Sequence, residues 1–401
     1  MTKYDVIVIG AGFAGCCAAA KLSKAGLKTL LIERASDPGT KNISGGVLWG
    51  NELDDVFPNW RKEAPLERYI DRKKLAFLSA DSAFAIDYQN YKWRREPHNG
   101  YSILRTKFDE YLAKKTEEQG AILITGIPIE KLAWKDGRVV GVIESGEVTY
   151  GECVIIADGA NSRVTLNEGL QKHGKSRFEF HEMAIGLKEV IKLPRDKLEE
   201  RFNCKNKNGV AMECVLGFLE NNVMAGGFLY TNLDTISLGV VINIASLFGT
   251  GLYSYDIIER FRTHPYINDL LSDGELIEYS AHLVPEGGYK MVPKVYGNGY
   301  LITGDAAGFC FSNGLVLQGM NYAALSGKLA AETVIEAYSI GDFSEKTLKL
   351  YKRKLDSSMV MKDLKNFENV SKITWNPRMY NDYNIKYRDI IKDIVRGIWY
   401  Y

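Results

Sequence analysis

The feature that most constrains the fold is the N-terminal segment YDVIVIGAGFAGCCAAAKLSKAGLKTLLIER, residues 4–34. Its apolar run at residues 6–9 predicts a buried parallel strand. A small-residue stretch to about Ala25 then predicts a helix, and residues 29–32 predict a second strand. A strand, a glycine turn, a helix and a second strand in this order are typical of a dinucleotide-binding βαβ unit.

The glycine turn of this unit has the spacing GxGxxG, at Gly10, Gly12 and Gly15. The first glycine permits the tight turn, the second lets the backbone approach a pyrophosphate, and the third allows close packing of helix on strand. The phosphates then meet the free amide groups at the helix N-terminus. Glu33 ends the second strand, where a carboxylate accepts hydrogen bonds from ribose hydroxyls. The unit serves either NAD or FAD, so the choice depends on the rest of the chain.

Four later segments carry further signals for a bound cofactor. The second glycine loop, KNISGGVLWG (41–50), offers backbone free of side chains on which a flavin ring could lie. The segment at 101–121 predicts a helix with Arg105 near its start, and GECVIIADGANSRV (151–164) predicts a strand that ends at Asp158 and Gly159. GYLITGDAAG (299–308) predicts a strand, a turn at Gly304 and Asp305, and the start of a helix.

These motifs together resemble a known family. GxGxxG, ADGANS (157–162) and GDAAG (304–308) are similar to the glutathione-reductase-type FAD fold, in its hydroxylase and geranylgeranyl-reductase branch. More narrowly, four segments resemble the FixC branch of the electron-transfer-flavoprotein:quinone oxidoreductase family: KNISGGVL (41–48), AIGLKEVIKLP (184–194), YSAHLVPEGGYKMVPKVYGNGYLITGDAAGF (279–309) and NGLVLQGMNYAALSGKLAAE (313–332). The resemblance covers most of residues 1–345.

The resemblance implies FAD as the cofactor, with the Gly304–Asp305 turn against its ribityl chain and Gly314, Gly319 and Met320 along its ring. Alternatively, Asp305 caps a helix that begins at Ala306. Gln318 stands where we expect a basic residue, so this position departs from the family pattern. The expected cofactor-binding residues are Gly10, Gly12, Ala14, Gly15, Glu33, Arg34, Ser44, Gly45, Gly46, Arg105, Asp158, Gly159, Gly304, Asp305, Gly308, Gly314, Leu315, Gly319 and Met320.

The predicted fold is α/β, with a glutathione-reductase-type Rossmann FAD-binding domain interleaved with an antiparallel-sheet substrate domain and followed by C-terminal helices. In the substrate domain, strands are expected at 184–190 and 237–244, where Lys188 and Glu189 either line the site or lie at a solvated sheet edge. The expected boundaries are 1–70, 100–165 and 290–345 for the FAD-binding domain, 71–99 and 166–289 for the substrate or quinone domain, and 346–401 for the helices.

The cysteines and histidines predict no metal site. Six cysteines are scattered without a CxxC pair, and five histidines show no ligand spacing. Cys16 and Cys17 follow the glycine turn as either redox-active thiols or small buried residues. By resemblance, the iron–sulfur centre would therefore lie on a separate small ferredoxin-like protein. The same resemblance implies an electron transfer flavoprotein as the electron donor and a membrane quinone as the acceptor.

Several functional classes are excluded and others stay open. A net charge of +1 gives no indication of nucleic-acid binding, and the absence of HExxH and GxSxG motifs argues against a hydrolase. Three alternatives to the quinone oxidoreductase remain: a geranylgeranyl-reductase-like enzyme that reduces prenyl double bonds, an NAD(P)H-dependent flavin hydroxylase, and a binding module in which FAD is structural.

The location of the protein follows from its apolar segments. The N-terminal apolar run passes straight into the glycine turn, and the uncharged window at 235–255 is better explained by a strand and a short loop, so a cytoplasmic enzyme is expected. The end of that window, 246–253, could contact the bilayer, line a quinone channel or belong to the core. Residues 387–398 repeat apolar side chains at helical spacing and precede Trp399. This amphipathic helix either anchors the protein to the inner face of the membrane or packs on protein.

Overall fold

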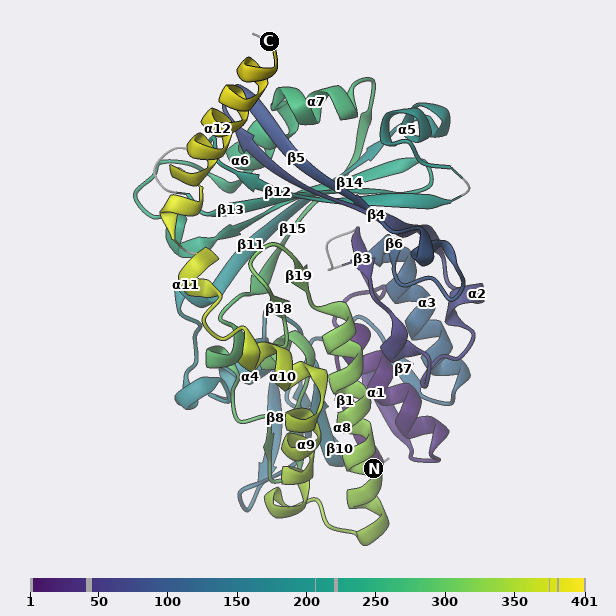
Figure 1. Cartoon of the computed structure of the whole chain (residues 1–401). Helices are drawn as coiled ribbons and strands as arrows, with labels where there is room; N and C mark the ends of the chain where they lie inside the picture. Colours follow the sequence, from purple (N-terminus) through teal and green to yellow (C-terminus); the bar gives the residue numbers. More distant parts are fainter. Residues whose placement is uncertain are drawn as a thin grey trace.

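The computed structural model describes residues 3–40, 45–205, 207–219, 223–374, 376–380 and 382–399. Two sheets organise this part of the chain, and Figure 1 shows the second lying above the first. Each has its own hydrophobic core. The α/β fold class predicted from the sequence is confirmed, because a parallel sheet flanked by helices is combined with a largely antiparallel one.

The first sheet is built around the N-terminal βαβ unit. Five of its strands are parallel, in the order β17-β10-β1-β2-β7, while β16 and the β8–β9 hairpin extend it antiparallel. These strands are β1 (Lys3–Ile9), β2 (Thr29–Ile32), β7 (Ile122–Ile124), β8 (Lys131–Lys135), β9 (Arg138–Glu144), β10 (Glu147–Ile156), β16 (Tyr296–Gly297) and β17 (Tyr300–Ile302). The first glycine turn follows the carboxyl end of β1 and packs against Ala157, just after β10, at the edge where ligands bind in open α/β sheets.

The second sheet has the order β15-β11-β14-β13-β12-β4-β6-β3, with β5 also paired to β4. All neighbours are antiparallel except β12 and β4. The strands are β3 (Gly46–Leu48), β4 (Leu66–Ser79), β5 (Ser82–Gln89), β6 (Tyr101–Ile103), β11 (Met183–Lys192), β12 (Asn208–Leu216), β13 (Ala225–Thr231), β14 (Thr235–Asn243) and β15 (Glu275–Pro285). Thus β3 and β6, from segments expected in the FAD-binding domain, pair within this sheet.

Helices cover both sheets. One group packs on the first sheet, and α5, α6 and α7 lie on the outer side of the second (Figure 1). The helices are α1 (Phe13–Lys24), α2 (Trp60–Glu63), α3 (Arg105–Glu118), α4 (Arg163–Asn167), α5 (Arg195–Phe202), α6 (Ser254–Thr263), α7 (Pro265–Leu271), α8 (Met320–Ile340), α9 (Glu345–Ser357), α10 (Met359–Asn366), α11 (Ser371–Thr374) and α12 (Asp382–Trp399). A Cβ at Gly327 would lie 2.1 Å from the carbonyl oxygen of Ala14, so α8 and α1 touch backbone to backbone.

The predicted helix start at Ala306 is wrong. Residues Gly304–Ala307 form a single 3₁₀ turn, which ends at Gly308 with a φ of +71°. A left-handed residue stops helical propagation, and only glycine adopts this conformation without strain. The chain then forms a short hairpin, β18 (Phe311–Ser312) and β19 (Leu317–Gln318), before α8 begins at Met320.

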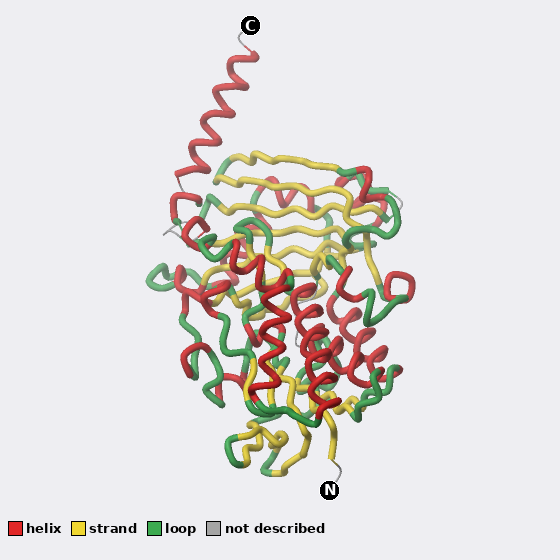
Figure 2. The backbone as a smooth tube through the Cα atoms, turned by 60° about the horizontal axis from the view of Figure 1, so that its bottom comes forward, coloured by secondary structure: helices red, strands yellow, loops and turns green. Residues whose placement is uncertain are grey.

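The C-terminal helix α12 runs beside β4 and β5 and extends past the body of the protein (Figure 2). The ring of Tyr387 lies 5.5 Å from that of Phe77 on β4, whereas Ile390 is 55% exposed. The helix therefore packs partly on its own protein and leaves apolar surface free. The side chains of residues 393–399, and the whole of residues 400–401, lie outside the described part of the chain.

Candidate functional site

A long cavity lies between the carboxyl ends of the parallel strands and the inner face of the second sheet. Its walls combine the first glycine turn, the end of β2, the second glycine loop, the strands β11 and β15, and the start of α8. We call it the flavin cavity because most of the predicted cofactor-binding residues lie on it. These are Gly10, Gly12, Ala14, Glu33, Arg34, Gly45, Gly46, Arg105, Asp158, Gly159, Gly304, Asp305, Gly319 and Met320.

The glycines of the first turn have three different surroundings. Gly10 has a φ of +98°, and a Cβ there would lie 2.3 Å from the carbonyl oxygen of Ala157. A Cβ at Gly15 would lie 1.8 Å from the carbonyl oxygen of Gly10, so this glycine holds α1 against the turn and does not line the cavity. Nothing lies within 4 Å of a Cβ at Gly12. The turn therefore presents bare backbone to the cavity at Gly12.

Glu33 is fixed by the turn that it faces. Its Oε2 accepts a hydrogen bond from the Ala11 amide at 2.8 Å, and its Oε1 accepts one from the Ala35 amide at 2.9 Å. Each carboxylate oxygen keeps a further lone pair, so the group can still accept hydrogen bonds from a ribose. Arg34 follows it, exposed at the end of the cavity.

Asp158 holds an acceptor without a partner. Its Oδ2 accepts a hydrogen bond from the Val164 amide at 2.8 Å, but its buried Oδ1 has no hydrogen-bond partner among the described residues. Burial raises the pKa of this carboxyl to about 6. The adjacent Gly159 has a φ of +74° and open space where a Cβ would stand. Because buried polar groups are normally hydrogen-bonded, this oxygen is available to accept a hydrogen bond from a ligand in the cavity.

Asp305 lies deep in the cavity, beside the start of α8. A Cβ at Gly319 would lie 3.5 Å from Oδ1 of Asp305, although the two residues are 14 positions apart in the chain. Burial raises the pKa of the Asp305 carboxyl, and the charges of His282 and Arg105 lower it in part. The N-cap residue of the 3₁₀ turn is Thr303 and Asp305 lies inside the turn, so the capping alternative is not what the structure has. Gly304 has a φ of +66°, and a Cβ there would lie 2.9 Å from the Cβ of Ala14.

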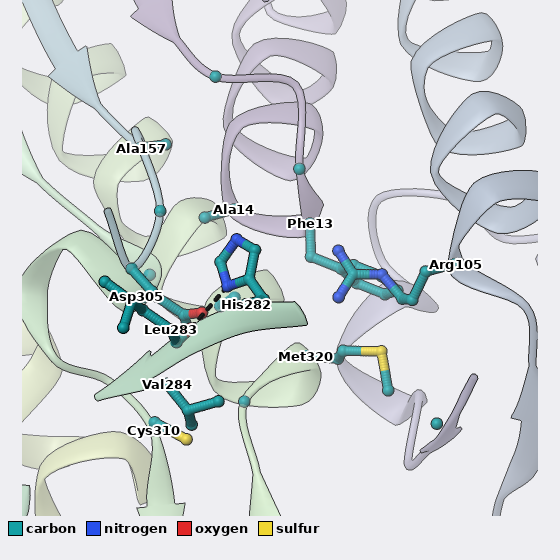
Figure 3. A pocket seen from close by; sticks show the side chains of 18 of the residues that line it. Phe13, Ala14, Arg105, Ala157, His282, Leu283, Val284, Asp305, Cys310 and Met320 are labelled. Atoms are coloured by element: carbon teal, nitrogen blue, oxygen red, sulfur yellow. Dashed lines mark hydrogen bonds between the residues drawn. The ribbon is translucent and has the colours of Figure 1, made fainter. Parts of the chain in front are cut away.

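His282 is the histidine that faces Asp305, from β15. Figure 3 shows its ring between Asp305 and Ala14, with the Nδ1 atom bonded to the carbonyl oxygen of Leu283 at 2.6 Å. Because a carbonyl only accepts, Nδ1 carries the proton of this bond. Burial lowers the pKa of the imidazole, which favours the neutral ring.

The second glycine loop forms the opposite wall. Gly45 has a φ of +84°, and a Cβ there would lie 2.3 Å from Oγ of Ser237. A Cβ at Gly46 would lie 3.1 Å from the methyl carbon of Met320, so this loop and the start of α8 face each other. Ser44, also predicted to contact the cofactor, lies outside the described residues. Gln318 lines the cavity as well and accepts a hydrogen bond from Asn321 at 3.2 Å.

The side chain of Arg105 is held by Asp109 and Phe13. Its Nε and Nη2 atoms donate to the two carboxylate oxygens of Asp109 at 2.8 and 2.7 Å, and Asp109 is completely buried. Its guanidinium stacks on the ring of Phe13 at 5.0 Å, as Figure 3 shows. Such a bidentate and stacked arginine holds one orientation.

Lys188 and Glu189 face opposite sides of the second sheet, because successive side chains in a strand alternate. Lys188 points into the cavity, donates to the carbonyl oxygen of Gly45 and lies 5.2 Å above the ring of Phe228. Burial, with a smaller effect of Arg105, lowers the pKa of its amine to about 7. Glu189 instead pairs with Arg262 of α6 at 3.4 Å, so the expectation that it could line the site is wrong.

Three other predicted residues lie away from the flavin cavity. A Cβ at Gly308 would lie 2.8 Å from Met291, which indicates a packing role. Gly314 and Leu315 belong to the hairpin that precedes α8 and line a neighbouring cavity. Cys16 and Cys17 are fully buried, and burial raises the pKa of both thiols, so packing explains them better than redox chemistry.

The neighbouring cavity, called the second cavity below, lies between β12–β14 and the β18–β19 hairpin. Its walls include the backbone of Gly226 and Gly227 and side chains from the region of Val370 and Tyr380. The two cavities share lining residues and are therefore adjacent. The shared residues are Glu213, Phe228, Tyr230, Val241, Val316 and Leu317.

The chain is similar to several known proteins. Residues 5–94 match the family "FAD dependent oxidoreductase", and residues 183–284 match the family "ETF-QO, ubiquinone-binding". Protein FixC of Escherichia coli strain K12 is 40% identical over 95% of this chain and 87% of its own length. The chain belongs to the FixC family.

Other relatives agree with this assignment. The probable electron transfer flavoprotein-quinone oxidoreductase YdiS of Escherichia coli is 38% identical over 98% of this chain and 90% of its own length. A geranylgeranyl bacteriochlorophyll reductase-like protein of Thermoplasma acidophilum has a TM-score of 0.73 at 21% identity, covering 93% of this chain and 88% of that chain. The myxobacterial halogenase CndH has a TM-score of 0.69 at 17% identity, covering 99% and 90%. These two structures share the fold.

The FixC-family chain is therefore an FAD-dependent oxidoreductase with a ubiquinone-binding region. Its residues fit the cofactor on three grounds: the orphan Oδ1 of Asp158, the bare backbone at Gly12, and the starts of α1 and α8, which carry no side-chain caps. Free amide groups at a helix start attract the anionic diphosphate and polarised oxygens of such a ligand.

Sequence reasoning missed several residues of the cavities. His282, Lys73, Glu213, Phe228 and Tyr230 all lie on the inner face of the second sheet. Their signal was the alternation of polar and apolar residues along each strand, but alternation does not tell which face meets the cofactor. Among the described residues no group of histidines, cysteines or acids could hold a metal ion, and no helix could span a bilayer.

Proposed function

We propose that this protein passes electrons from an electron transfer flavoprotein to a membrane quinone through its FAD, working beside a small ferredoxin-like iron–sulfur protein. The observation that carries the proposal is the adjacency of the two cavities. The first has the features of a flavin site, and the second is lined in part by β12, β13 and β14, which belong to the segment that matches the ubiquinone-binding family. A quinone in the second cavity would meet the flavin across the shared residues Phe228 and Leu317.

FAD, when bound, accepts electrons from one partner and releases them to another. In the proposed arrangement Gly10 and Gly12 admit the diphosphate, and Glu33 accepts hydrogen bonds from the adenosine ribose. Asp305 and the orphan oxygen of Asp158 take the polar groups along the middle of the cofactor. The remaining predicted residues on the flavin cavity complete its walls.

The charges of the flavin cavity suit an anionic dinucleotide. Arg105 is held by Asp109, and Lys188 is held against the Gly45 carbonyl on the opposite wall. Because burial favours the neutral amine of Lys188, a nearby negative charge would raise its affinity for a proton. This residue would therefore respond to charge that develops on a ligand beside it.

The membrane contact is proposed at α12 and the adjacent hairpin. Ile86 and Tyr88 on β5 are 52% and 54% exposed, and Ile390 on the helix is 55% exposed. The segment 246–253 was also a candidate for bilayer contact. Its Phe248 and Tyr253 are exposed, at 61% and 65%, and do not belong to the core. Deleting residues 387–401 and measuring flotation with liposomes tests the role of the helix. Unchanged flotation would show that α12 is not the anchor.

The electron route is tested by reducing the bound flavin without oxygen. The bleaching of the flavin absorbance monitors the reduction. Reduced electron transfer flavoprotein, NADH and NADPH are compared as donors, and a short-chain ubiquinone analogue is then added to reoxidise the flavin. The proposal expects reduction by the flavoprotein and reoxidation by the quinone. Rapid quinone reduction from NADH alone would refute the need for partners.

The same experiment distinguishes the alternatives. Reduction by NADPH with consumption of oxygen would indicate a hydroxylase, and reoxidation by a prenyl substrate would indicate a geranylgeranyl-reductase-like enzyme. A flavin that none of these donors reduces would indicate a binding module. The 21% identity to the reductase-like structure supports a common fold and leaves the substrate to this test.

A further inference from the structure

The second cavity has an unusual distribution of charge. Among its described lining residues there is no lysine, arginine, histidine or aspartate. Its acids are two glutamates, Glu213 and Glu286, while the rest of the wall is glycine, tyrosine, serine, asparagine, cysteine and aliphatic or aromatic side chains. A wall without cations does not suit an anionic ligand. The wall suits an uncharged ligand with an apolar body. The carboxyl groups of Glu213 and Glu286 would then lie beside that ligand.

Glu286 follows the end of β15, in the segment PEGG. Its amide donates to the carbonyl oxygen of Glu182 at 2.8 Å, which fixes the backbone. Its side chain has no hydrogen-bond or ion-pair partner among the described residues. Burial raises the pKa of this carboxyl to about 7, and the titratable groups that face it, the Cys310 thiol and the Tyr380 phenol, are themselves neutral because burial raises the pKa of each.

Glu213 stands at the junction, since it lines both cavities. It lies on β12 directly opposite Phe228 of β13. Burial raises the pKa of the Glu213 carboxyl, and the Lys73 charge lowers it only in part. The other titratable groups near it are the Tyr230 phenol and the thiol of the neighbouring Cys214, whose pKa values burial also raises. No described residue donates a hydrogen bond to this carboxyl or pairs with it.

We propose that Glu213 and Glu286 are the two proton donors for the quinone-class acceptor in the second cavity. This inference rests on the function proposed above and names the residues that serve it. Reducing a quinone to its quinol requires two electrons, which the reduced flavin supplies, and two protons. Each carboxyl loses its O–H proton to one carbonyl oxygen of the quinone, and each carboxylate then recovers a proton from water. Two acids in an otherwise uncharged wall match this requirement.

The test separates proton delivery from electron delivery. The FAD-loaded protein is photoreduced without oxygen and mixed in a stopped-flow instrument with a short-chain ubiquinone analogue or with ferricenium, which takes an electron but no proton. The variants are Glu213→Gln and Glu286→Gln, with Glu286→Asp as the conservative change. Glu275→Gln, an exposed position at the start of the same strand β15, is the matched control.

Loss of a general acid slows a proton-dependent step by about 10²–10⁴-fold. We expect reoxidation by the quinone to slow by at least about 10²-fold in each glutamine variant, while ferricenium reoxidises all proteins at the wild-type rate. Glu286→Asp should recover part of the quinone rate, and Glu275→Gln should keep all of it. In the wild type the quinone rate should fall above about pH 7 as Glu286 deprotonates, and Glu286→Gln should lose that dependence.

A second measurement does not depend on turnover. Infrared difference spectra of the oxidised, FAD-loaded protein, recorded as the pH rises, should show the band of a protonated carboxyl that disappears near pH 7 and is missing in Glu286→Gln. Quinone reoxidation at the wild-type rate in both glutamine variants would overturn the inference. A wild-type protein that reacts with ferricenium but with no quinone would instead overturn the proposed function.

Discussion

Replacing Gly15 with alanine tests how α1 packs on the first glycine turn. The added Cβ would lie 1.8 Å from the carbonyl oxygen of Gly10. Cβ atoms in real proteins essentially never lie within 3.0 Å of such an atom, so the turn and the helix must separate by at least 1.2 Å. The obstructing atom is backbone and cannot rotate away. Overpacking of this kind costs about 1–3 kcal/mol of the free energy of unfolding.

Gly12→Ala is the matched control for this change. No atom lies within 4 Å of a Cβ at Gly12, and its φ of −85° is ordinary for alanine. The fold without cofactor should therefore lose less than about 1 kcal/mol, the usual effect of alanine at a helix start. FAD binding should nevertheless weaken, because the methyl group stands where the backbone approaches the pyrophosphate.

Two assays distinguish these effects. Urea unfolding of the FAD-free proteins should give a lower midpoint with an unchanged slope for Gly15→Ala and a midpoint near the wild-type value for Gly12→Ala. Titration with FAD, followed by quenching of flavin fluorescence, should show at least about tenfold weaker binding for Gly12→Ala, which is about 1.4 kcal/mol. A Gly15→Ala protein that unfolds at the wild-type midpoint, or equal destabilisation by both changes, would refute the reasoning.

Three further predictions concern buried charges. Arg105→Met removes both hydrogen bonds to the buried Asp109 carboxylate and should cost about 3–5 kcal/mol in urea unfolding, with part recovered when Asp109→Asn is added. Arg68 is fully buried and donates to three carbonyl oxygens and to Glu199; Arg68→Lys cannot reproduce this fork and should cost about 1–3 kcal/mol. Burial lowers the pKa of Lys188 to about 7, below the value of about 10.4 in the unfolded chain, so the unfolded state binds more protons between these values. The unfolding free energy of the FAD-free protein should therefore rise from pH 7 toward pH 10, and Lys188→Met should lack this rise at matched pH values.

The nucleotide-binding part could be predicted from the sequence because its signals are local. The strand at Thr29–Ile32 and the helix that begins at Arg105 stand where the apolar pattern indicated. A glycine that must approach another backbone is visible in a short motif, since the partners Gly10 and Gly15 lie within six residues of chain. FAD as the cofactor and the FixC family followed from such motifs and are confirmed.

The errors arose where tertiary contacts decide. The alanines after Asp305 favour a helix by propensity, but Gly308 ends the turn in a left-handed conformation against Met291. Lys188 and Glu189 could not both face the cavity, because neighbouring strand residues point to opposite faces. Choosing between them requires knowing that α6, with Arg262, covers one of those faces.

The contact between the two cavities could not be predicted from the sequence, because it depends on the register of four strands. Lys188, Gly239, Phe228 and Glu213 are direct partners across β11, β14, β13 and β12. A Cβ at Gly239 would lie 2.1 Å from the ring of Phe228, so the missing side chain lets that ring lie across β14. The ring thereby separates the Lys188 amine, on the flavin cavity, from the Glu213 carboxyl that both cavities share. In the sequence Gly239 is only a residue that weakens a strand. Its partner Phe228 becomes apparent only when the strands are paired, so the contact between the cofactor and acceptor sites is a property of the sheet and of no single motif.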